Sequence, residues 1–482
     1  MAQSRYIGTT IGPIFDVMSF SSTPAALWAS SYLFSHLSKC ICEELVKKGV
    51  DTADIIAPYY EKDSEIIRTM TDKGVGMFHD HIIFRQKEFR IEEMIEVRAA
   101  VLDRVSEDFS IDRDYLEDFI LISAVSFEAD YADGRNPLLV SSRMFDSLEL
   151  SKKVVPVEKS NPILNQFTGV DENDRNTGKN ELIKKIVLDN LGCSDWQLLK
   201  RDNSRTLKSL ESIQSGDYYA IVRADGDDMG KYIASLSSDE QLRTFSEECF
   251  TYCRNVADKV KDFGGITIYA GGDDLLAITP CVTKDGRTVL DFVKEAQECF
   301  AHKLSFGISV CYTKFPLYEA LADSADLLFG DAKNRYVDGR QKKHNTAIRI
   351  RKHSGQTESF LIGNETLDAL IASQHAVTDA KAGNKEEVFL SALHKLAMFR
   401  ELFDTAAAEE NAATIQAVFD NVFDAHDQNT AFLHRALPDM FSSIVDGRMD
   451  IVSTGTEESG TADTLSNVLR MFKFFIERSQ GK

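Results

Sequence analysis

The sequence predicts an α+β protein made of several domains. The chain has 482 residues, of which 43% are hydrophobic and 27% charged, a composition that can bury cores and excludes whole-chain disorder. Strand and helix patterns alternate over 1–109 and again over 213–355, whereas 110–212 and 356–482 are mainly helical in pattern. These four ranges are the predicted domains.

The first range carries the elements of a small α+β layer. The sequence predicts a strand at 6–13, a helix from Pro24, short strands at 54–59 and 77–84, and a helix over 91–105. That order of strands and helices is typical of a sheet with helices packed against it.

The charge balance excludes some classes of protein. With 55 basic and 76 acidic residues the net charge is −21, and an acidic surface repels nucleic-acid backbones. A stand-alone RNA- or DNA-coating protein is therefore excluded. The eight cysteines include no CxxC pair, so no zinc ribbon is predicted. No secretory signal or membrane-length apolar run appears, which predicts a cytoplasmic protein without membrane contact.

The strongest signal for chemistry follows an apolar strand at 218–222. The strand leads into Arg223-Ala224-Asp225-Gly226-Asp227-Asp228-Met229-Gly230, so several carboxylates gather at its end. Bunched carboxylates repel one another, and a folded protein tolerates them best when a cation neutralises them. The motif therefore predicts a cation site.

A second acidic motif is predicted at the tip of a β-hairpin. Two apolar strands, 265–270 and 275–279, flank Gly271-Gly272-Asp273-Asp274, where the glycines permit a tight turn. Between the two motifs, 238–263 has the pattern of one long amphipathic helix. Strand, helix and hairpin can therefore bring both acidic motifs to one end of an antiparallel sheet.

Carboxylates in that arrangement fit nucleotidyl transfer. Two divalent ions held about 3.5–4 Å apart can activate a 3′-hydroxyl and stabilise a leaving pyrophosphate. Either motif alone also fits a solvated turn, but the two together favour catalysis. We predict that the metal ligands and catalytic residues are Asp225, Asp273 and Asp274.

A basic residue for the triphosphate is predicted downstream. After a strand at 304–310, a helix over 317–336 carries Lys333 in its last turn. A lysine there can bind phosphate oxygens, or it can simply compensate the helix dipole. The predicted nucleotide-binding residues are Gly271, Gly272, Asp227, Asp228 and Lys333.

These motifs resemble those of a known family. The DGDDMG and GGDD elements are similar to the cyclase palm of the Cas-ten family, the large subunits of type III CRISPR effector complexes. They are more distantly similar to GGDEF diguanylate cyclases. The runs 11–16 and 27–33 resemble the first palm of the III-B, or Cmr-type, branch.

The resemblance implies a fold and an activity. It implies two ferredoxin-like palm domains, at 1–109 and 213–355, with a helical insert and a C-terminal helical domain. It also implies that the palm, with two Mg²⁺ or Mn²⁺ ions, polymerises ATP into cyclic oligoadenylate second messengers when target RNA binds. The implied partners are the other subunits of the complex, with guide RNA and target RNA bound through it. By residue, Asp225 matches the family's first metal-binding aspartate, and Asp273 and Asp274 match its GGDD pair.

One family feature is expected to be absent, and two other functions stay open. Many members begin with an HD nuclease domain, but here the first palm pattern begins close to Met1. The run His79-Asp80-His81 lies in a strand pattern and lacks further His and Asp ligands, so no nuclease is predicted. The same palm can instead join AMP from ATP to a different acceptor or make a cyclic dinucleotide. Alternatively, the chain is a non-catalytic scaffold subunit.

Overall fold

The computed structural model describes residues 4–19, 24–62, 64, 74–109, 111–133, 135–150, 217–379, 385–423, 431–454 and 460–479. The chain forms two compact units. Unit 1 combines Met1–Ser212, Asp228–Ala277 and Pro316–Tyr318. Unit 2 combines Ile213–Asp227, Ile278–Phe315 and Glu319–Lys482.

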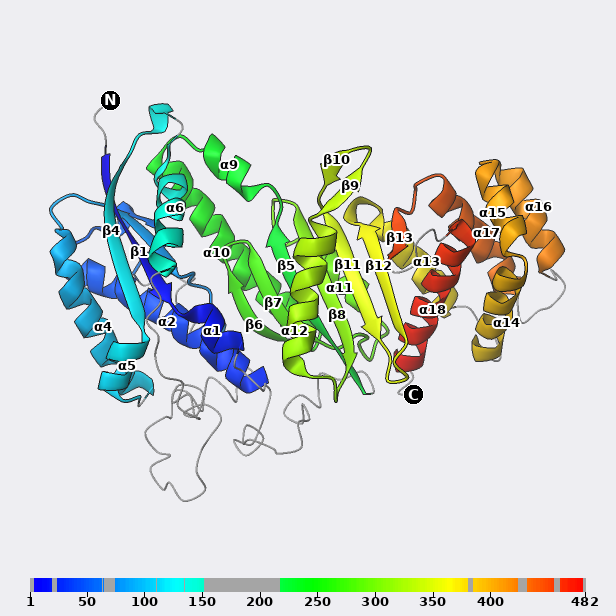
Figure 1. Cartoon of the computed structure of the whole chain (residues 1–482), viewed down its shortest axis with the longest axis horizontal. Helices are drawn as coiled ribbons and strands as arrows, with labels where there is room; N and C mark the ends of the chain where they lie inside the picture. Colours follow the sequence, from blue (N-terminus) through cyan, green and yellow to red (C-terminus); the bar gives the residue numbers. More distant parts are fainter. Residues whose placement is uncertain are drawn as a thin grey trace, which may run out of the picture. The chain divides into compact units, whose positions relative to one another are not determined.

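Unit 1 contains a four-stranded antiparallel sheet (Figure 1). Its strands run in the order β2 (Ile55–Ala57), β3 (His81–Arg85), β1 (Ser4–Gly12) and β4 (Leu121–Ala129), each antiparallel to its neighbour. One helical segment connects β1 to β2 and another connects β3 to β4. This chain order with this strand order is the ferredoxin-like arrangement that the resemblance implies for the first palm.

The helices of unit 1 begin where local chemistry favours it. The helix α2 (Pro24–Lys47) starts at a proline, whose fixed φ suits the first helical turn. At the start of α6 (Pro137–Glu149), the Asn136 side chain accepts a hydrogen bond from the backbone N–H of Leu139. The remaining α-helices that the structure describes in the first 150 residues are α1 (Ile14–Ser19), α4 (Met94–Phe109) and α5 (Arg113–Phe119).

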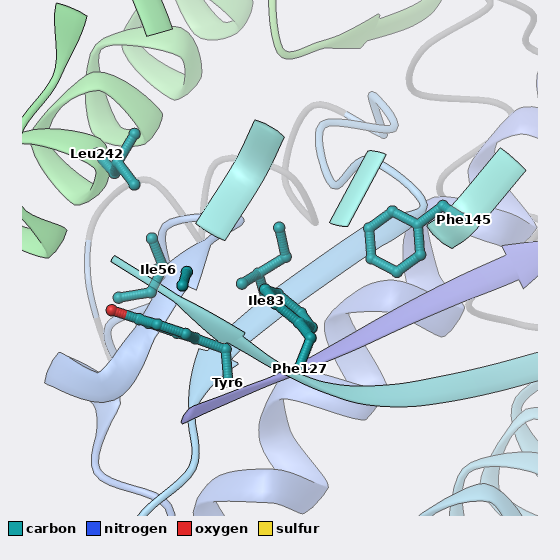
Figure 2. Close-up of a cluster of buried hydrophobic side chains, with 7 residues drawn as sticks. Tyr6, Ile56, Ile83, Phe127, Phe145 and Leu242 are labelled. Atoms are coloured by element: carbon teal, nitrogen blue, oxygen red, sulfur yellow. The ribbon is translucent and has the colours of Figure 1, made fainter. Parts of the chain in front are cut away.

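A buried hydrophobic cluster ties the sheet of unit 1 to its helices. Figure 2 shows side chains from strands and helices meeting in this cluster. Because these residues lie far apart in the chain, their burial holds α6 and α10 (Asp239–Asp262) to the sheet. The labelled members are Tyr6, Ile56, Ile83, Phe127, Phe145 and Leu242.

The strand β4 lies beyond the predicted end of the first domain. The sequence analysis ends that domain at 109 and expects helices next, whereas β4 pairs with β1 from Ser4 opposite Ala129 to Gly12 opposite Leu121. As an edge strand, β4 is only partly buried over most of its length, so its sequence lacks a clear alternation. The rest of the predicted helical insert, 151–212, lies outside the described residues.

The second sheet has seven strands in the order β13-β12-β11-β8-β5-β7-β6. Four of them, with helices after the first and before the last, repeat the ferredoxin-like strand order of the first sheet. These are β5 (Tyr218–Gly226), β6 (Ile266–Gly271), β7 (Asp274–Thr279) and β8 (Leu304–Tyr312). The predicted fold class, α+β with palm-like domains, is confirmed.

The helices of this region follow the predicted pattern with one change. The helix α10 matches the prediction over 238–263, and the Ser238 hydroxyl caps it by accepting from the N–H of Gln241. The helix predicted over 317–336 is α12 (Leu317–Asp326) followed by a π-helical turn, η7 (Leu327–Ala332). The remaining elements here are α9 (Met229–Ser235), α11 (Val289–Gln297), β9 (Arg335–Val337) and β10 (Arg340–Lys342).

The last part of the chain is helical, but it also adds strands. The strand β11 (Asn345–Arg351) runs parallel to β8, and the antiparallel strands β12 (Thr357–Gly363) and β13 (Ile451–Thr454) follow it in the sheet. Both β12 and β13 come from the range predicted as helical. None of the helices in the described part of the chain is long and apolar enough to cross a membrane. The C-terminal helices are α13 (Leu367–Asp379), α14 (Lys385–Met398), α15 (Arg400–Ala408), α16 (Ala412–Val422), α17 (Ala431–Val445) and α18 (Thr461–Ser479).

Candidate active site

The first predicted carboxylate lies at the end of the buried strand β5 in unit 2. The residues Tyr218–Val222 are fully covered, whereas the side chain of Asp225 is 21% exposed. In the antiparallel pairing of β5 with β8, Asp225 lies opposite Ser305. The strand therefore carries its carboxylate out of the apolar core and towards the solvent at one end of the sheet.

Lys333 contacts this carboxylate directly. It caps the C-terminus of η7, and its ammonium forms an ion pair with Asp225 Oδ2. The same Nζ donates to the carbonyl oxygen of Gly226 at 2.7 Å and lies 4.0 Å from Asp227 Oδ1. Since the Lys333 side chain is only 15% exposed, its charge is held among these three acceptors.

Asp227 is turned inward and is held by the neighbouring strand. Its two carboxylate oxygens each lie 2.9 Å from the Ser305 hydroxyl, and its backbone N–H donates to the Lys303 carbonyl at 2.8 Å. Burial raises the pKa of Asp227, although the Ser305 hydroxyl, the Lys333 charge and the His344 backbone oppose that shift. The carboxylates of Asp225 and Asp227 and the ammonium of Lys333 together form an acidic cluster, and Asp227 is its buried member.

Asp228 lies in a different environment, at the start of α9 in unit 1. It adopts a left-handed backbone conformation with a φ of 58°. Its carboxylate is 48% exposed and pairs with Lys231 Nζ at 2.9 Å. Of the adjacent aspartates 227 and 228, the first is therefore buried against β8 and the second faces solvent.

The GGDD sequence forms the predicted tight hairpin in unit 1. Because β6 ends at Gly271 and β7 begins at Asp274, the two turn residues are Gly272 and Asp273. Gly272 has a φ of 64°, which glycine adopts without a steric penalty. A Cβ atom on Gly271 would meet the ring and hydroxyl of Tyr269, so a side chain here would displace that tyrosine.

Burial and the negative charge of the turn shift the pKa values of two side chains behind it, Cys253 and Tyr269. Burial, and then the charges of Asp273 and Asp274, raise the pKa of the Cys253 thiol. Burial and then Asp274 act in the same direction on the pKa of Tyr269. The Cys253 thiol also donates to the Gly272 carbonyl at 3.6 Å. Both groups therefore stay neutral near pH 7 and add no further negative charge beside the aspartates.

The predicted metal ligands have suitable chemistry for Mg²⁺ or Mn²⁺, since carboxylate oxygens are the donors that these ions prefer. In the part of the chain that the structure describes, three potential ligand atoms come within 4.8 Å of one another in two groups: Asp80, His81 and Glu149, and His36, Cys40 and Asp108. The three predicted ligands are in neither group, so their joint role stays a prediction.

Sequence reasoning missed the residues that support the acidic cluster. Ser305 binds Asp227, and its hydroxyl accepts from the His344 backbone N–H at 3.0 Å. His344 in turn has a φ of 65°, unusual for a residue with a side chain. No local pattern marks either residue, because a serine within a buried strand and a histidine after a short hairpin have no periodic signature.

Two family models match the chain. The model described as "Cas10/Cmr2, second palm domain" matches residues 218–342, a range that holds every predicted site residue. The model described as "CRISPR-associated protein Cmr2, N-terminal" matches residues 6–110. The two matches fall on the two regions that carry the sequence motifs.

Individual relatives agree with these models. The CRISPR system Cmr subunit Cmr2 of Pyrococcus furiosus is 36% identical over 190 residues, which cover 33% of this chain and 21% of that relative's length. A chain of the apo-state type III-B Cmr-beta structure has a TM-score of 0.57 at 12% identity, with 99% of this chain and 82% of that chain covered. A chain of a Csm1–Csm4 cassette in complex with cA4 has a TM-score of 0.53 at 13% identity, with 98% and 70% covered. These structures share the fold of this chain.

Proposed function

We propose that this chain is a metal-dependent nucleotidyltransferase. The reason is that it belongs to the III-B branch of the Cas10/Cmr2 family, the large subunits of type III CRISPR complexes. It polymerises ATP into cyclic oligoadenylates when its complex binds target RNA. The Csm1–Csm4 cassette of similar fold was solved with cA4, which supports an adenylate product here.

The observation that carries the proposal is the grouping of charges at the end of β5. Asp225 and Asp227 meet the ammonium of Lys333 there. The GGDD turn between β6 and β7 carries two more carboxylates, those of Asp273 and Asp274. A scaffold has no need for such a costly concentration of carboxylates.

Each predicted residue has a role in this proposal. Asp225, Asp273 and Asp274 hold the two Mg²⁺ or Mn²⁺ ions through their carboxylate oxygens. When bound, such ions supply Lewis-acid activation of a 3′-hydroxyl and neutralise charge on the leaving pyrophosphate. Gly271 and Gly272 carry no side chains, so no side chain of theirs would block the approach of a nucleotide to the turn.

The remaining residues bind or orient the triphosphate. Lys333 donates to its oxygens, which compete with Asp225 for the ammonium. Asp227 is a positioning residue, because its buried carboxylate is fixed by Ser305 and lies 4.0 Å from Lys333 Nζ. Asp228, exposed at the start of α9, contacts the nucleotide from solvent.

The proposal includes partners and a location. The chain acts with the other subunits of a type III complex, and guide RNA and target RNA reach it through that complex. Contact with RNA through partner subunits suits a chain with a net charge of −21, because its acidic surface repels phosphates. Cys40, Cys249 and Cys281 are among several buried free thiols, which suits the reducing cytoplasm.

The direct test measures product formation by the assembled complex. The full chain, its partner subunits, guide RNA, target RNA, ATP and Mg²⁺ or Mn²⁺ are incubated, and the products are identified by mass spectrometry. We expect cyclic oligoadenylates from the native chain and none from the double variant Asp273→Ala, Asp274→Ala, whose circular dichroism and melting temperature stay native. Asp285→Asn removes an exposed carboxylate that contacts Thr283 and Arg287, and it serves as the active control.

Each alternative gives a different result in the same assay. Undiminished synthesis by the double variant removes the GGDD pair from the mechanism. Adenylated products other than rings of AMP indicate another acceptor. If the native complex makes no nucleotide product with any target RNA, the chain is a scaffold.

A further inference from the structure

A cluster of three metal-ligating side chains lies in unit 1, and the proposed function gives none of them a role. We propose that Asp80, His81 and Glu149 form a separate site for a transition-metal dication of borderline softness, with Zn²⁺ as the expected ion. The sequence shows only the neighbouring pair Asp80 and His81. Glu149 is the ligand that sequence analysis missed, because it lies 68 residues further along the chain from His81.

The distances between the ligand atoms suit a single ion. His81 Nε2 lies 2.9 Å from Glu149 Oε1 and 3.9 Å from Asp80 Oδ2, and the three ligand atoms lie within 4.8 Å of one another. Ligands that each bind Zn²⁺ at about 2.0–2.2 Å stand roughly 3.3 Å apart in a tetrahedron. The ligand atoms therefore stand close to the separations that one bound ion requires.

Three elements of unit 1 bring the ligands together. Asp80 directly precedes β3, and His81 is the first residue of that strand, opposite Thr10 of β1. Glu149 is the last residue of α6. The site would therefore link the C-terminus of α6 to the start of β3, beside β1.

Two further contacts fix the orientation of the ligands. The Thr10 hydroxyl donates to Glu149 Oε1 at 2.7 Å. The His81 ring stacks on Phe145, one helical turn before Glu149, with 4.4 Å between ring centroids. Phe145 is itself buried in the core of unit 1, as Figure 2 shows. Such contacts hold ligands in place before a metal ion arrives.

The charge of the cluster favours a cation. Two carboxylates face one imidazole, and within the described residues neither Asp80 nor Glu149 forms an ion pair with a lysine or arginine. The other three-ligand group differs, because Arg104 lies 3.6 Å from Asp108 and neutralises it, and burial raises the pKa of the Cys40 thiol to about 12. Of the two groups, the Asp80 cluster is thus the one without a lysine or arginine partner among the described residues.

The ligand set indicates which ion is preferred. One imidazole nitrogen with two carboxylates suits Zn²⁺, whereas Mg²⁺ prefers oxygen donors alone and keeps most of its water. The ligands are 35% to 47% exposed, so water can complete the coordination shell. The site is distinct in ligand type from the all-carboxylate site proposed for catalysis.

The test is metal binding by the full-length chain, measured without ATP. Chelator-treated protein is titrated with Zn²⁺ by calorimetry in an excess of Mg²⁺, and Co²⁺ is used as a spectroscopic probe. We expect one saturable site with visible d–d absorption bands from Co²⁺. His81→Gln and Glu149→Gln should each weaken Zn²⁺ binding at least tenfold, and Thr10→Val should weaken it by a similar factor.

The control variants separate this site from other metal-binding groups. His375→Gln removes a histidine that lies 3.2 Å from Asp291, outside both three-ligand groups of the described residues, and should leave Zn²⁺ binding unchanged. The variant Asp273→Ala, Asp274→Ala should also bind Zn²⁺ normally, which keeps this test independent of the proposed catalysis. Native Zn²⁺ affinity in both His81→Gln and Glu149→Gln, or binding abolished by excess Mg²⁺, would overturn the proposal. Thr10→Val leaves all three ligands present, so it remains informative if a ligand variant fails to fold.

Discussion

Lys333 occupies the position beside Asp225 that a bound cation would also favour. Its ammonium contacts Asp225, donates to Gly226, and lies within 4.0 Å of Asp227. A charge-assisted contact in such a partly buried place contributes about 1.5–3 kcal/mol. The side chain therefore stabilises the acidic residues around it, and in the proposed reaction it would donate to phosphate oxygens.

Replacing Lys333 should impair the use of ATP more than it impairs folding. We expect Lys333→Met to lower the rate of product formation at limiting ATP by about 10- to 100-fold, because one charge-assisted contact is lost. Lys333→Arg should restore part of the rate. The measurement is initial rate against ATP concentration in the assembled complex. Lys294→Met, which removes an exposed lysine 2.7 Å from Asp368, should match the native chain. Equal rates for Lys333→Met and the native chain would remove this residue from the site.

At the scale of elements, β8 and the helical segment α12–η7 pack closely because of one glycine. A Cβ atom on Gly307 would lie 2.2 Å from the Ser324 carbonyl oxygen and 2.5 Å from the Leu328 backbone nitrogen. Both atoms belong to the backbone, so no change of side-chain rotamer can make room. This close approach brings the end of η7, and with it Lys333, to the end of β5.

The variant Gly307→Ala should therefore affect stability and activity together. We expect a loss of about 1–3 kcal/mol in the free energy of unfolding, because the helix must move away from the sheet. Synthesis should fall as Lys333 is displaced from Asp225. Gly330→Ala is the matched control within η7, since nothing lies within 4 Å of its added Cβ atom. Chemical denaturation and product analysis measure the two effects, and a native-like Gly307→Ala protein would contradict the packing argument.

At the scale of the whole molecule, the net charge of −21 weakens direct binding of the chain to RNA. Protein contacts to phosphates depend on lysine and arginine, and an acidic surface opposes them through long-range repulsion. In the complex that we propose, base pairing with guide RNA and contacts from partner subunits would supply the specificity for target RNA.

The isolated chain should bind single-stranded RNA weakly. At about 150 mM salt we expect a dissociation constant weaker than about 10 µM, at the weak end of non-specific binding. Fluorescence anisotropy with a labelled RNA measures this value, and the assembled complex with guide RNA provides the positive comparison. Submicromolar binding by the chain alone would show a basic surface that the charge balance conceals.

Much of the fold could be predicted from local patterns, and the misses have physical causes. The helix α10 follows its amphipathic pattern and begins after the Ser238 cap, within a residue of the predicted bounds. Within the range predicted as mainly helical, α14 and α15 are separate helices that meet near Phe399. The strands β4, β12 and β13 were missed because their patterns depend on which neighbours cover them.

The sequence by itself determined the features that depend on near neighbours in the chain. These are the carboxylates after β5, the glycine turn of the GGDD hairpin and the helical periods between them. Only the tertiary structure decided that Ser305 supports Asp227, that Lys333 contacts Asp225 and that Glu149 reaches His81. Each of these pairs joins residues far apart in the chain. Their contact depends on how strands and helices pack, and that packing leaves no periodic trace in the sequence around either partner.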